Sequence, residues 1–349
     1  MTAEFRIAGR KIGPSHPPFV ICELSGNHNG SLDRALTMID AAAETGCDAI
    51  KLQTYTADTL TLDCDGPGFR IEAGPWAGRT LHDLYAEAFT PYDWHAALFE
   101  RARQRGVTLF STPFDETAVE LLEGLDAPAY KIASFEAVDL PLIVRVARCG
   151  KPMIISTGLA SLAEMDEALR TAQVNGAAGV ALLHCVSAYP APIDEANVRT
   201  VPDLARRFGV VTGLSDHTPG TAAAVAAVAL GAAIIEKHFT LARADGGPDA
   251  AFSLEPAEFA ALVRDCKAAW SALGSATYDE LGSEGAAAGH RRSLYVAAPV
   301  TAGERLTAAN VRSVRPGHGL APKHLPDILG RHAARDLKFG EPLDWSMVE

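Results

Sequence analysis

Eight short apolar segments alternate with longer amphipathic segments, and this alternation is the feature that most limits what the chain can fold into. The apolar segments are rich in Val, Ile, Leu and Ala and show little polar alternation, which is typical of parallel strands buried on both faces. Eight strands that alternate with helices fit a (β/α)8 TIM barrel. The predicted strands cover residues 19–26, 49–54, 108–113, 129–134, 152–158, 180–186, 210–217 and 234–239.

A doubly wound parallel sheet is the alternative for the same alternation. Such a sheet usually carries a Gly-rich phosphate loop after an early strand, and the chain contains neither G-x-G-x-x-G nor G-x-x-x-x-G-K-[ST]. The first amphipathic segment begins with Ser31, a suitable helix N-cap, and ends at Gly46, a stop signal. We therefore predict the α/β class and a TIM barrel.

Two segments interrupt the alternation. Residues 55–90 are too long for an ordinary connection between a strand and a helix, and long connections of this kind cover the active face of a barrel, so we expect a lid there. Residues 274–292 are polar and rich in Gly and Ala, and short strands and turns follow them. We expect a catalytic barrel over residues 1–273, a linker over 274–292 and a small β-rich domain over 293–349.

The charge and the cysteines exclude several classes of protein. Lys and Arg total 31 against 43 Asp and Glu, so the net charge is −12, which argues against a nucleic-acid or anionic membrane surface. The chain has neither a signal-peptide pattern nor an apolar run long enough to cross a membrane. Its 6 cysteines are scattered, as reduced thiols of a cytoplasmic protein are.

Polar side chains with useful chemistry close nearly every predicted strand. Because the carboxyl ends of barrel strands converge on one mouth, where active sites are built, we expect these side chains to meet there. One such residue would carry little information, but a series in register favours a functional site. The series is Glu23, Lys51 and Gln53, Ser111 and Thr112, Lys131 and Ser134, Ser156 and Thr157, His184 and Ser187, Ser215 to His217, and Glu236 to His238.

Lys51 and Lys131 stand in apolar strands, where an unpaired ammonium group is costly. One interpretation is a structural ion pair with Glu23 or Glu136. The other, which we favour, is a site for a phosphate or carboxylate, helped by nearby Ser and Thr hydroxyls.

His217 and His238 close the last two strands, which are neighbours in a barrel. Two imidazoles at one mouth suit a divalent metal ion with positions left for water or substrate. Asp249, after the last strand, fits a sugar contact and a turn equally well. Arg315 lies in a Gly/Pro turn, where an ordinary surface arginine is the default interpretation.

Eight short motifs then identify a resemblance that runs almost from end to end. In chain order they are CELSGNHNG, IKLQT, FSTPFD, YKIASFE, ISTG, GLSDHT, EKHFT and RPGHGL. The chain resembles the sialic acid synthase (N-acetylneuraminate synthase) family, whose members have a barrel followed by an antifreeze-like (SAF) domain. The segments GPWAGRTLHDLYAEAFTPYDWH, HCVSAYPAPIDEAN and PDAAFSLE are most similar to the pseudaminic acid synthase branch.

The resemblance implies a condensation of phosphoenolpyruvate (PEP) with an aldehyde-form amino sugar, with a divalent metal such as Mn2+, Mg2+ or Co2+ as cofactor. It also implies a homodimer that swaps its C-terminal domain, so that Arg315 would reach the sugar bound by the other subunit. It assigns PEP to Lys51, Thr112, Lys131, Ser134, Ser156 and Ser215, the metal to His217 and His238, the proton to Glu23 or Glu136, and the sugar to Glu23, Gln53, Glu136, Ser187, Tyr189, Asp249 and Arg315.

Two alternatives to this function remain open. A legionaminic or N-acetylneuraminic acid synthase would share most of the motifs, but Ser187 stands where the N-acetylneuraminate enzymes usually carry Asn, which favours a different sugar. A glycan- or ice-binding protein on a degenerate barrel would have no need of the Lys, Ser and His residues at the strand ends, and all of them are present.

Overall fold

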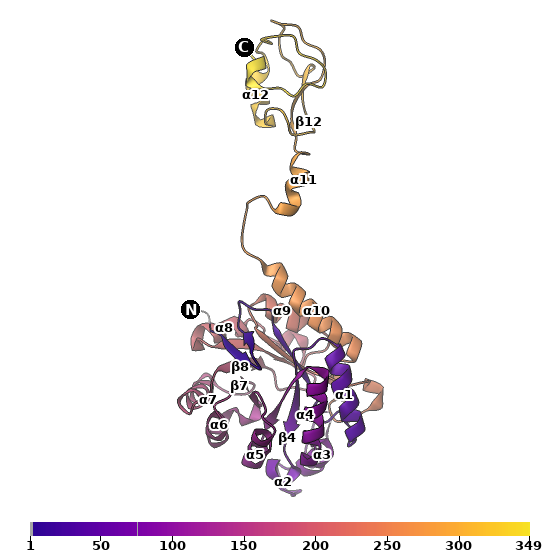
Figure 1. The fold of residues 1–349 in the computed structure, drawn as a ribbon, viewed down its shortest axis with the longest axis vertical. Helices are drawn as coiled ribbons and strands as arrows, with labels where there is room; N and C mark the ends of the chain where they lie inside the picture. The colour runs from indigo at the N-terminus through magenta and orange to yellow at the C-terminus, as the bar shows by residue number, and fades with distance from the viewer. Residues whose placement is uncertain (1–2, 75) are drawn as a thin grey trace. The chain divides into compact units, whose positions relative to one another are not determined.

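The computed structural model describes residues 3–74 and 76–349. The chain divides into two compact units, Met1–Gly274 and Ser275–Glu349. In Figure 1 the first runs from indigo to orange and the second from orange to yellow. The first unit holds the alternating strands and helices, and the second holds a small antiparallel sheet. Each unit has an apolar core of its own.

Within the described residues, eight parallel strands close into a barrel in the order β10-β3-β4-β5-β6-β7-β8-β9. Strand β10 (Ile234–His238) pairs with β3 (Phe19–Glu23), so that His238 lies opposite Glu23. The predicted TIM barrel is confirmed, and each observed strand lies inside its predicted segment. The remaining strands are β4 (Ala49–Thr54), β5 (Thr108–Pro113), β6 (Tyr130–Ile132), β7 (Met153–Ser156), β8 (Val180–Cys185) and β9 (Val211–Asp216).

Helices surround the barrel, as Figure 1 shows. The first of them begins as the sequence predicts, because Ser31 Oγ accepts a hydrogen bond from the backbone N–H of Arg34. It ends where Gly46 adopts a φ of +77°. The outer helices are α1 (Leu32–Glu44), α4 (His95–Arg105), α5 (Glu116–Gly124), α6 (Leu140–Ala147), α7 (Leu162–Val174), α8 (Thr200–Phe208), α9 (Ala222–Ala229) and α10 (Pro256–Leu273).

Alternation along each strand separates two apolar layers. Successive side chains of a strand point to opposite faces, so one set fills the barrel and the other packs against the helices. In β10, Ile234 belongs to the cluster inside the barrel and Ile235 to the cluster beneath the helices. The same rule then directs Glu236 and His238 inward and Lys237 outward.

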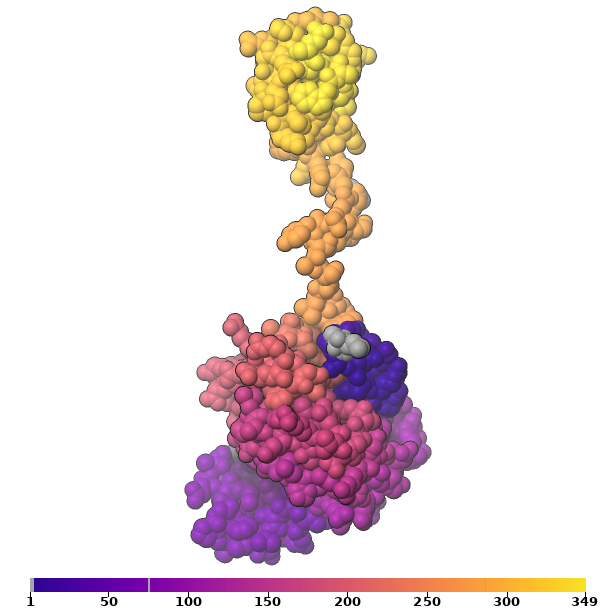
Figure 2. Space-filling model, turned by 90° about the vertical axis from the view of Figure 1, so that its left-hand side faces the viewer, coloured from indigo at the N-terminus to yellow at the C-terminus, as the bar shows by residue number. Residues whose placement is uncertain are grey.

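An antiparallel hairpin fills the amino end of the barrel. It consists of β1 (Phe5–Ile7) and β2 (Arg10–Ile12). Its buried side chains Phe5, Ile7 and Ile12 join the same apolar cluster as the barrel interior. Figure 2 shows the N-terminal residues in indigo, gathered at one end of the barrel unit.

The predicted lid, residues 55–90, contains regular structure. It starts with α2 (Ala57–Leu60) and ends with α3 (Leu81–Ala88). Between them a hairpin is closed by an isolated bridge between Arg70 and Thr80. The backbone N–H of Leu81 also donates to Phe69 O at 2.8 Å. Residue 75, which the predicted lid includes, lies outside the described residues.

The second unit is small and β-rich. Strands β11 (Ser293–Val296) and β12 (Val311–Val314) pair antiparallel, and α12 (Leu325–Ile328) packs into their core. The predicted linker includes a short helix, α11 (Gly285–Ala288). No helix among the described residues of either unit is long and apolar enough to cross a membrane.

Candidate active site

The inward-facing positions near the carboxyl ends of the strands are polar. This contrasts with the positions one layer deeper, such as Ile21, Phe110 and Ile154, which are apolar and buried. The alternation of side chains therefore brings most of the predicted site residues to one mouth. These inward residues are Glu23, Lys51, Gln53, Thr112, Lys131, Ser156, Ser215, His217, Glu236 and His238.

Lys51 is held between two carboxylates. Its Nζ lies 2.6 Å from Glu23 Oε2 and 3.6 Å from Glu236 Oε1, and it donates to Thr112 Oγ1 at 3.1 Å. Burial lowers the pKa of Lys51, but the two carboxylates outweigh this effect and raise it. Lys51 is therefore a permanent buried cation.

Lys131 shares the second of these carboxylates. Its Nζ lies 3.7 Å from Glu236 Oε1 and donates to Ser156 Oγ at 2.7 Å. Ser215 Oγ also donates to Glu236, at 3.3 Å. Burial lowers the pKa of Lys131, although Glu236 opposes the shift. Lys51 and Lys131 thus converge on Glu236, and Lys51 also contacts Glu23. Lys131 has Glu236 as its one carboxylate contact among the described residues, so an incoming anion can join it.

Glu236 was missed as a site residue by the sequence analysis, although it appears among the strand-end residues. Burial raises its pKa, but Lys131 and Lys51 outweigh this effect and hold the pKa below its usual range. The sequence does contain a signal for Glu236. It lies two residues before His238 on the same strand, so both side chains face the barrel interior.

The two histidines predicted to bind a metal lie side by side. The ring centroids of His217 and His238 are 5.4 Å apart. His217 Nδ1 lies 2.9 Å from Val186 O, so it carries the hydrogen and leaves Nε2 free. His238 Nδ1 is buried without a hydrogen-bond partner among the described residues, and Asp249 Oδ2 lies 3.8 Å from it.

Asp249 belongs to a hydrogen-bonded group at the side of the mouth next to β3, the first strand of the barrel. Ser25 Oγ donates to Asp249 Oδ2, and Gln53 Nε2 donates to Ser25 Oγ at 3.2 Å and to Glu23 Oε1 at 2.9 Å. Burial raises the pKa of Asp249. Ser25, like Glu236, was not predicted as a site residue. The predicted strand 19–26 includes Ser25, but the observed strand ends at Glu23, and Ser25 adopts a φ of +50° in the turn that follows.

Glu136 stands apart from the lysine cluster. It lies in the short 3-10 helix Phe135–Val138 after β6, and its Oε2 is buried without a hydrogen-bond partner in the described structure. Burial raises its pKa to about 7. A carboxyl group with a pKa near neutrality can both give and take a proton at physiological pH.

The remaining hydroxyls and the tyrosine lie on the opposite side of the mouth. Ser134 and Ser187 approach each other so closely at Gly158 that a Cβ on that glycine would collide with both hydroxyls. The Tyr189 ring lies 4.4 Å from the His217 ring. Ser187 and Tyr189 therefore lie on the same side of the mouth as His217, with Cys185 in contact with both Ser187 and His217.

Five strand-end residues of the predicted series do not face the mouth. The expectation that they would meet there is wrong, because each occupies the outward phase of its strand. Lys237 Nζ, for example, lies 2.6 Å from Asp216 Oδ2 outside the barrel, and His184 Nε2 lies 2.8 Å from Ala196 O. The five are Ser111, Thr157, His184, Asp216 and Lys237.

Arg315 lies in the second unit, directly after β12. It is exposed and makes no ion pair with any residue that the structure describes. Its turn is well fixed, since Ser293 Oγ donates to Pro316 O at 2.7 Å. The arginine is thus available to an anion or a carbonyl outside its own unit.

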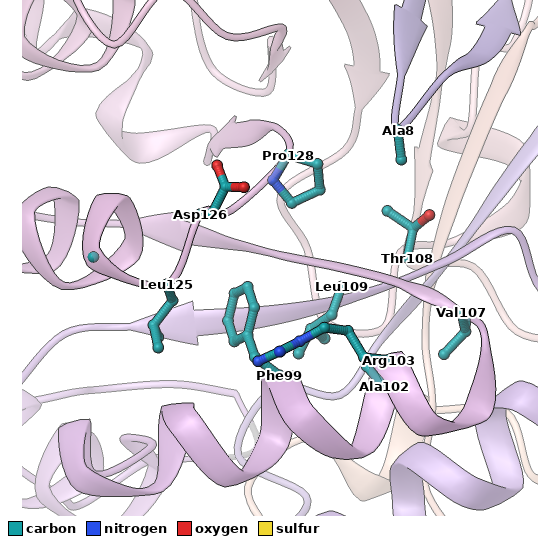
Figure 3. A pocket seen from close by; sticks show the side chains of 11 residues that line it. Ala8, Phe99, Ala102, Arg103, Val107, Thr108, Leu109, Leu125, Asp126 and Pro128 are labelled. Atoms are coloured by element: carbon teal, nitrogen blue, oxygen red, sulfur yellow. The ribbon is translucent and has the colours of Figure 1, made fainter.

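A cavity of about 470 Å³ lies at the other end of the barrel (Figure 3). Ala8, Phe99 and Pro128 contribute to its lining. Its charged residues Arg103 and Asp126 are exposed and already form ion pairs elsewhere. Because it contains no buried ionisable cluster, we place the active site at the mouth with the lysines.

Comparison with known proteins identifies the family to which the chain belongs. Residues 38–278 match the NeuB family, and residues 291–349 match the SAF domain. The chain belongs to the NeuB family, which confirms the resemblance seen in the motifs.

Particular relatives narrow this class. Pseudaminic acid synthase of Campylobacter jejuni is 44% identical over 93% of this chain and 95% of its own length. Pseudaminic acid synthase of Helicobacter pylori is 42% identical over 95% and 98%. A crystal structure of N-acetylneuraminic acid synthetase from Leptospira borgpetersenii superposes with a TM-score of 0.74 at 32% identity, covering 81% of this chain and 94% of that one. The prediction of an enzyme is confirmed by these synthases.

Proposed function

We propose that this chain is a pseudaminic acid synthase. It would condense PEP with 2,4-diacetamido-2,4,6-trideoxy-L-altropyranose and water to give pseudaminic acid and phosphate. The observation that carries the proposal is the buried pair Lys51 and Lys131 around Glu236, one layer below His217 and His238. The identity of 42–44% with two pseudaminic acid synthases supports the choice of sugar.

PEP would bind to the lysine layer. Its phosphate and carboxylate carry the negative charge that two buried ammonium groups can hold, and the hydrogen bonds would be charge-assisted and therefore strong. The hydroxyls around Lys51 and Lys131 would complete the cradle, because a buried anion needs a donor for each oxygen. These hydroxyls belong to Thr112, Ser134, Ser156 and Ser215.

The histidine pair fits a divalent metal ion. His217 keeps a free Nε2, and His238 has a buried nitrogen without a partner. No group of three His, Cys, Asp or Glu side chains in the described residues could hold a metal, so water or substrate would complete the coordination. When bound by His217 and His238, Mn2+, Mg2+ or Co2+ would supply a Lewis acid for the aldehyde oxygen of the open-chain sugar.

The protein would position the two reactants for carbon–carbon bond formation. Lys51 and Lys131 would hold PEP with its C3 against the aldehyde carbon. The bond-forming step between the two substrates would then be effectively unimolecular. C3 forms the new bond, the aldehyde oxygen takes up a proton, and water adds to C2 while losing a proton to a carboxylate. The bond between C2 and the bridging oxygen then breaks, so phosphate leaves and C2 becomes a ketone.

The proposal is tested by phosphate release from PEP that carries 18O in the bridging position. We expect release with the 2,4-diacetamido-6-deoxy sugar of the L-altro series, with the label in phosphate. The panel should include the legionaminic and N-acetylneuraminic acid precursors, which are the alternative substrates. Faster turnover of either would contradict the assigned sugar, and label retained in the sugar acid would contradict the cleavage of the C–O bond.

Glu136 is the carboxyl group that we favour for accepting the proton of water. Since burial raises its pKa to about 7, it is mostly protonated below that pH and mostly a carboxylate above it. We expect kcat/KM to rise with pH through about 7 in the wild type, because a base must be deprotonated. Glu136→Gln should lose this rising limb. A variant that keeps it would assign the proton to Glu23 instead.

We propose that Arg315 completes the site of the partner subunit in a homodimer with swapped C-terminal domains. Arg315→Ala and Lys131→Ala subunits would each be inactive alone. When the two are mixed, about a quarter of the sites should be intact, since half of the dimers are mixed and each has one complete site. Activity measured after subunit exchange tests this, and its absence would mean that each site comes from one chain.

We place the reaction in the cytoplasm. The six cysteines are free and four of them are buried, which suits a compartment where thiols stay reduced. The substrates in this proposal are small molecules, and the net charge of −12 argues against nucleic-acid binding.

A further inference from the structure

The hairpin of the lid reaches across the barrel mouth through one tryptophan. Trp76 Nε1 donates a hydrogen bond to Pro248 O at 2.7 Å, and Pro248 lies in the loop after the last strand of the barrel. The lid follows the second strand of the barrel, so this contact joins two loops 172 residues apart in the sequence. The helix at the end of the lid packs against the same loop region, because a Cβ on Gly26 would collide with both Ala88 and Pro248.

Three aromatic rings meet where this contact forms. The Trp76 ring lies 5.8 Å from the Tyr189 ring and 6.4 Å from the Phe252 ring, and the last two are 5.3 Å apart. We call Trp76, Tyr189 and Phe252 the aromatic wall. Each ring comes from a different loop of the mouth, so the wall exists only when the three loops are together.

The aromatic wall stands directly against the histidine pair. Tyr189 lies 4.4 Å from His217, and Phe252 lies 5.1 Å from His238. A molecule bound at the histidines therefore also contacts the rings. The other side of the histidines is polar, with Asp249 and the hydroxyl of Ser25. The mouth thus presents one hydrogen-bonding side and one apolar side to the same ligand.

An apolar side next to a sugar site is informative, because most carbons of a sugar carry a hydroxyl or an amide. A hydroxyl against aromatic carbon loses its hydrogen bonds to water without replacement, whereas a methyl group gains from the burial. We propose that Trp76 is a specificity-determining residue: it closes the aromatic wall over the sugar and selects a sugar with a deoxygenated, apolar carbon at that position. This inference rests on the proposed function and specifies the sugar by its 6-deoxy carbon.

Trp76 also fixes the loop that carries Asp249, the residue after Pro248. A structural role of the indole N–H is therefore the competing explanation, and two substitutions separate it from the apolar role. Trp76→Phe keeps an aromatic face and removes the N–H donor. Trp76→Gln keeps an N–H donor and removes the aromatic face.

The measurement is the ratio of kcat/KM for the 6-deoxy sugar to kcat/KM for the same 2,4-diacetamido sugar with a hydroxyl on C6. We expect Trp76→Phe to keep the wild-type ratio within about threefold. Trp76→Gln should lower the ratio about tenfold or more, since an apolar pocket discriminates by one to two orders of magnitude. The KM for PEP should stay unchanged in both variants, because PEP binds one layer deeper.

Trp270 provides a matched control at the amino end of the barrel unit. It is half-buried, and its Nε1 donates to Pro14 O at 3.2 Å, so it repeats the Trp76 contact away from the mouth. Trp270→Gln should leave the ratio unchanged. If Trp76→Gln keeps the ratio and Trp76→Phe lowers it, the apolar role is overturned. A wild type that turns over neither sugar would overturn the proposed function and this inference with it.

Discussion

Replacing Lys131 by methionine is expected to lower kcat/KM for PEP by about two to three orders of magnitude. The substitution shortens the buried, unbranched side chain by one atom and removes its charge and its hydrogen bond to Ser156. A preorganised donor in a water-excluded site typically contributes this much to catalysis. Lys51 would remain to balance Glu236, so the barrel interior would not be left with two unpaired carboxylates.

Lys237→Met is the matched control for this experiment. Lys237 is as deeply buried as Lys131 and pairs with Asp216 at 2.6 Å, but it faces the helices. Its loss leaves the buried Asp216 carboxylate without its cationic partner, although Thr218 still donates to it. Breaking a buried ion pair in this way costs about 3–5 kcal/mol of stability. We expect a lower Tm in Lys237→Met with an unchanged KM for PEP. Equal losses of PEP binding in the two variants would contradict the assignment of PEP to the mouth.

If His217 and His238 hold the proposed metal ion, removing it is expected to abolish turnover altogether. Incubation with a chelator should stop phosphate release, and His217→Ala should not recover activity at ordinary metal concentrations, because one of the two imidazoles is gone. Metal content should be measured on the same samples. We expect bound metal in the wild type and a large loss of it in His217→Ala. Full activity in the presence of chelator would contradict the metal site.

His184→Ala controls for the loss of a strand-end histidine. His184 lies on the strand before that of His217, but it faces outward and contacts Ala196 O at 2.8 Å. It should retain both metal and activity, apart from an effect on stability. A similar loss of metal in the two variants would indicate a general disturbance of the barrel rather than the loss of a ligand.

The fold could be predicted because its signals are local and repeated. Each strand is marked by an apolar run in the sequence. Because parallel strands need both faces covered, eight such runs alternating with helices fit few architectures. The inward site residues follow from the same logic once the phase of each strand is known. A polar residue at a strand end does not by itself show whether its side chain faces inward or outward. Lys237 and His184 were therefore predicted at the mouth, although both face outward.

The features of the candidate site that could not be predicted from the sequence lie in loops. Glu136, Ser25 and Trp76 follow strands in segments whose path is set by contacts far away in the sequence. No periodicity in residues 55–90 indicates that Trp76 donates to Pro248 O. The motifs supplied Glu136 through the resemblance, but its raised pKa follows only from the burial that the fold imposes.

The hairpin at the amino end of the barrel closes that end to ligands. Phe5, Ile7 and Ile12 fill that end, so any ligand that reaches Lys131 must enter past His217 and His238. The ligand of the deeper layer then has to arrive before the ligand of the upper layer and cannot depart before it. Under the proposed function, the shape of the barrel would therefore require PEP to bind first and the sugar second.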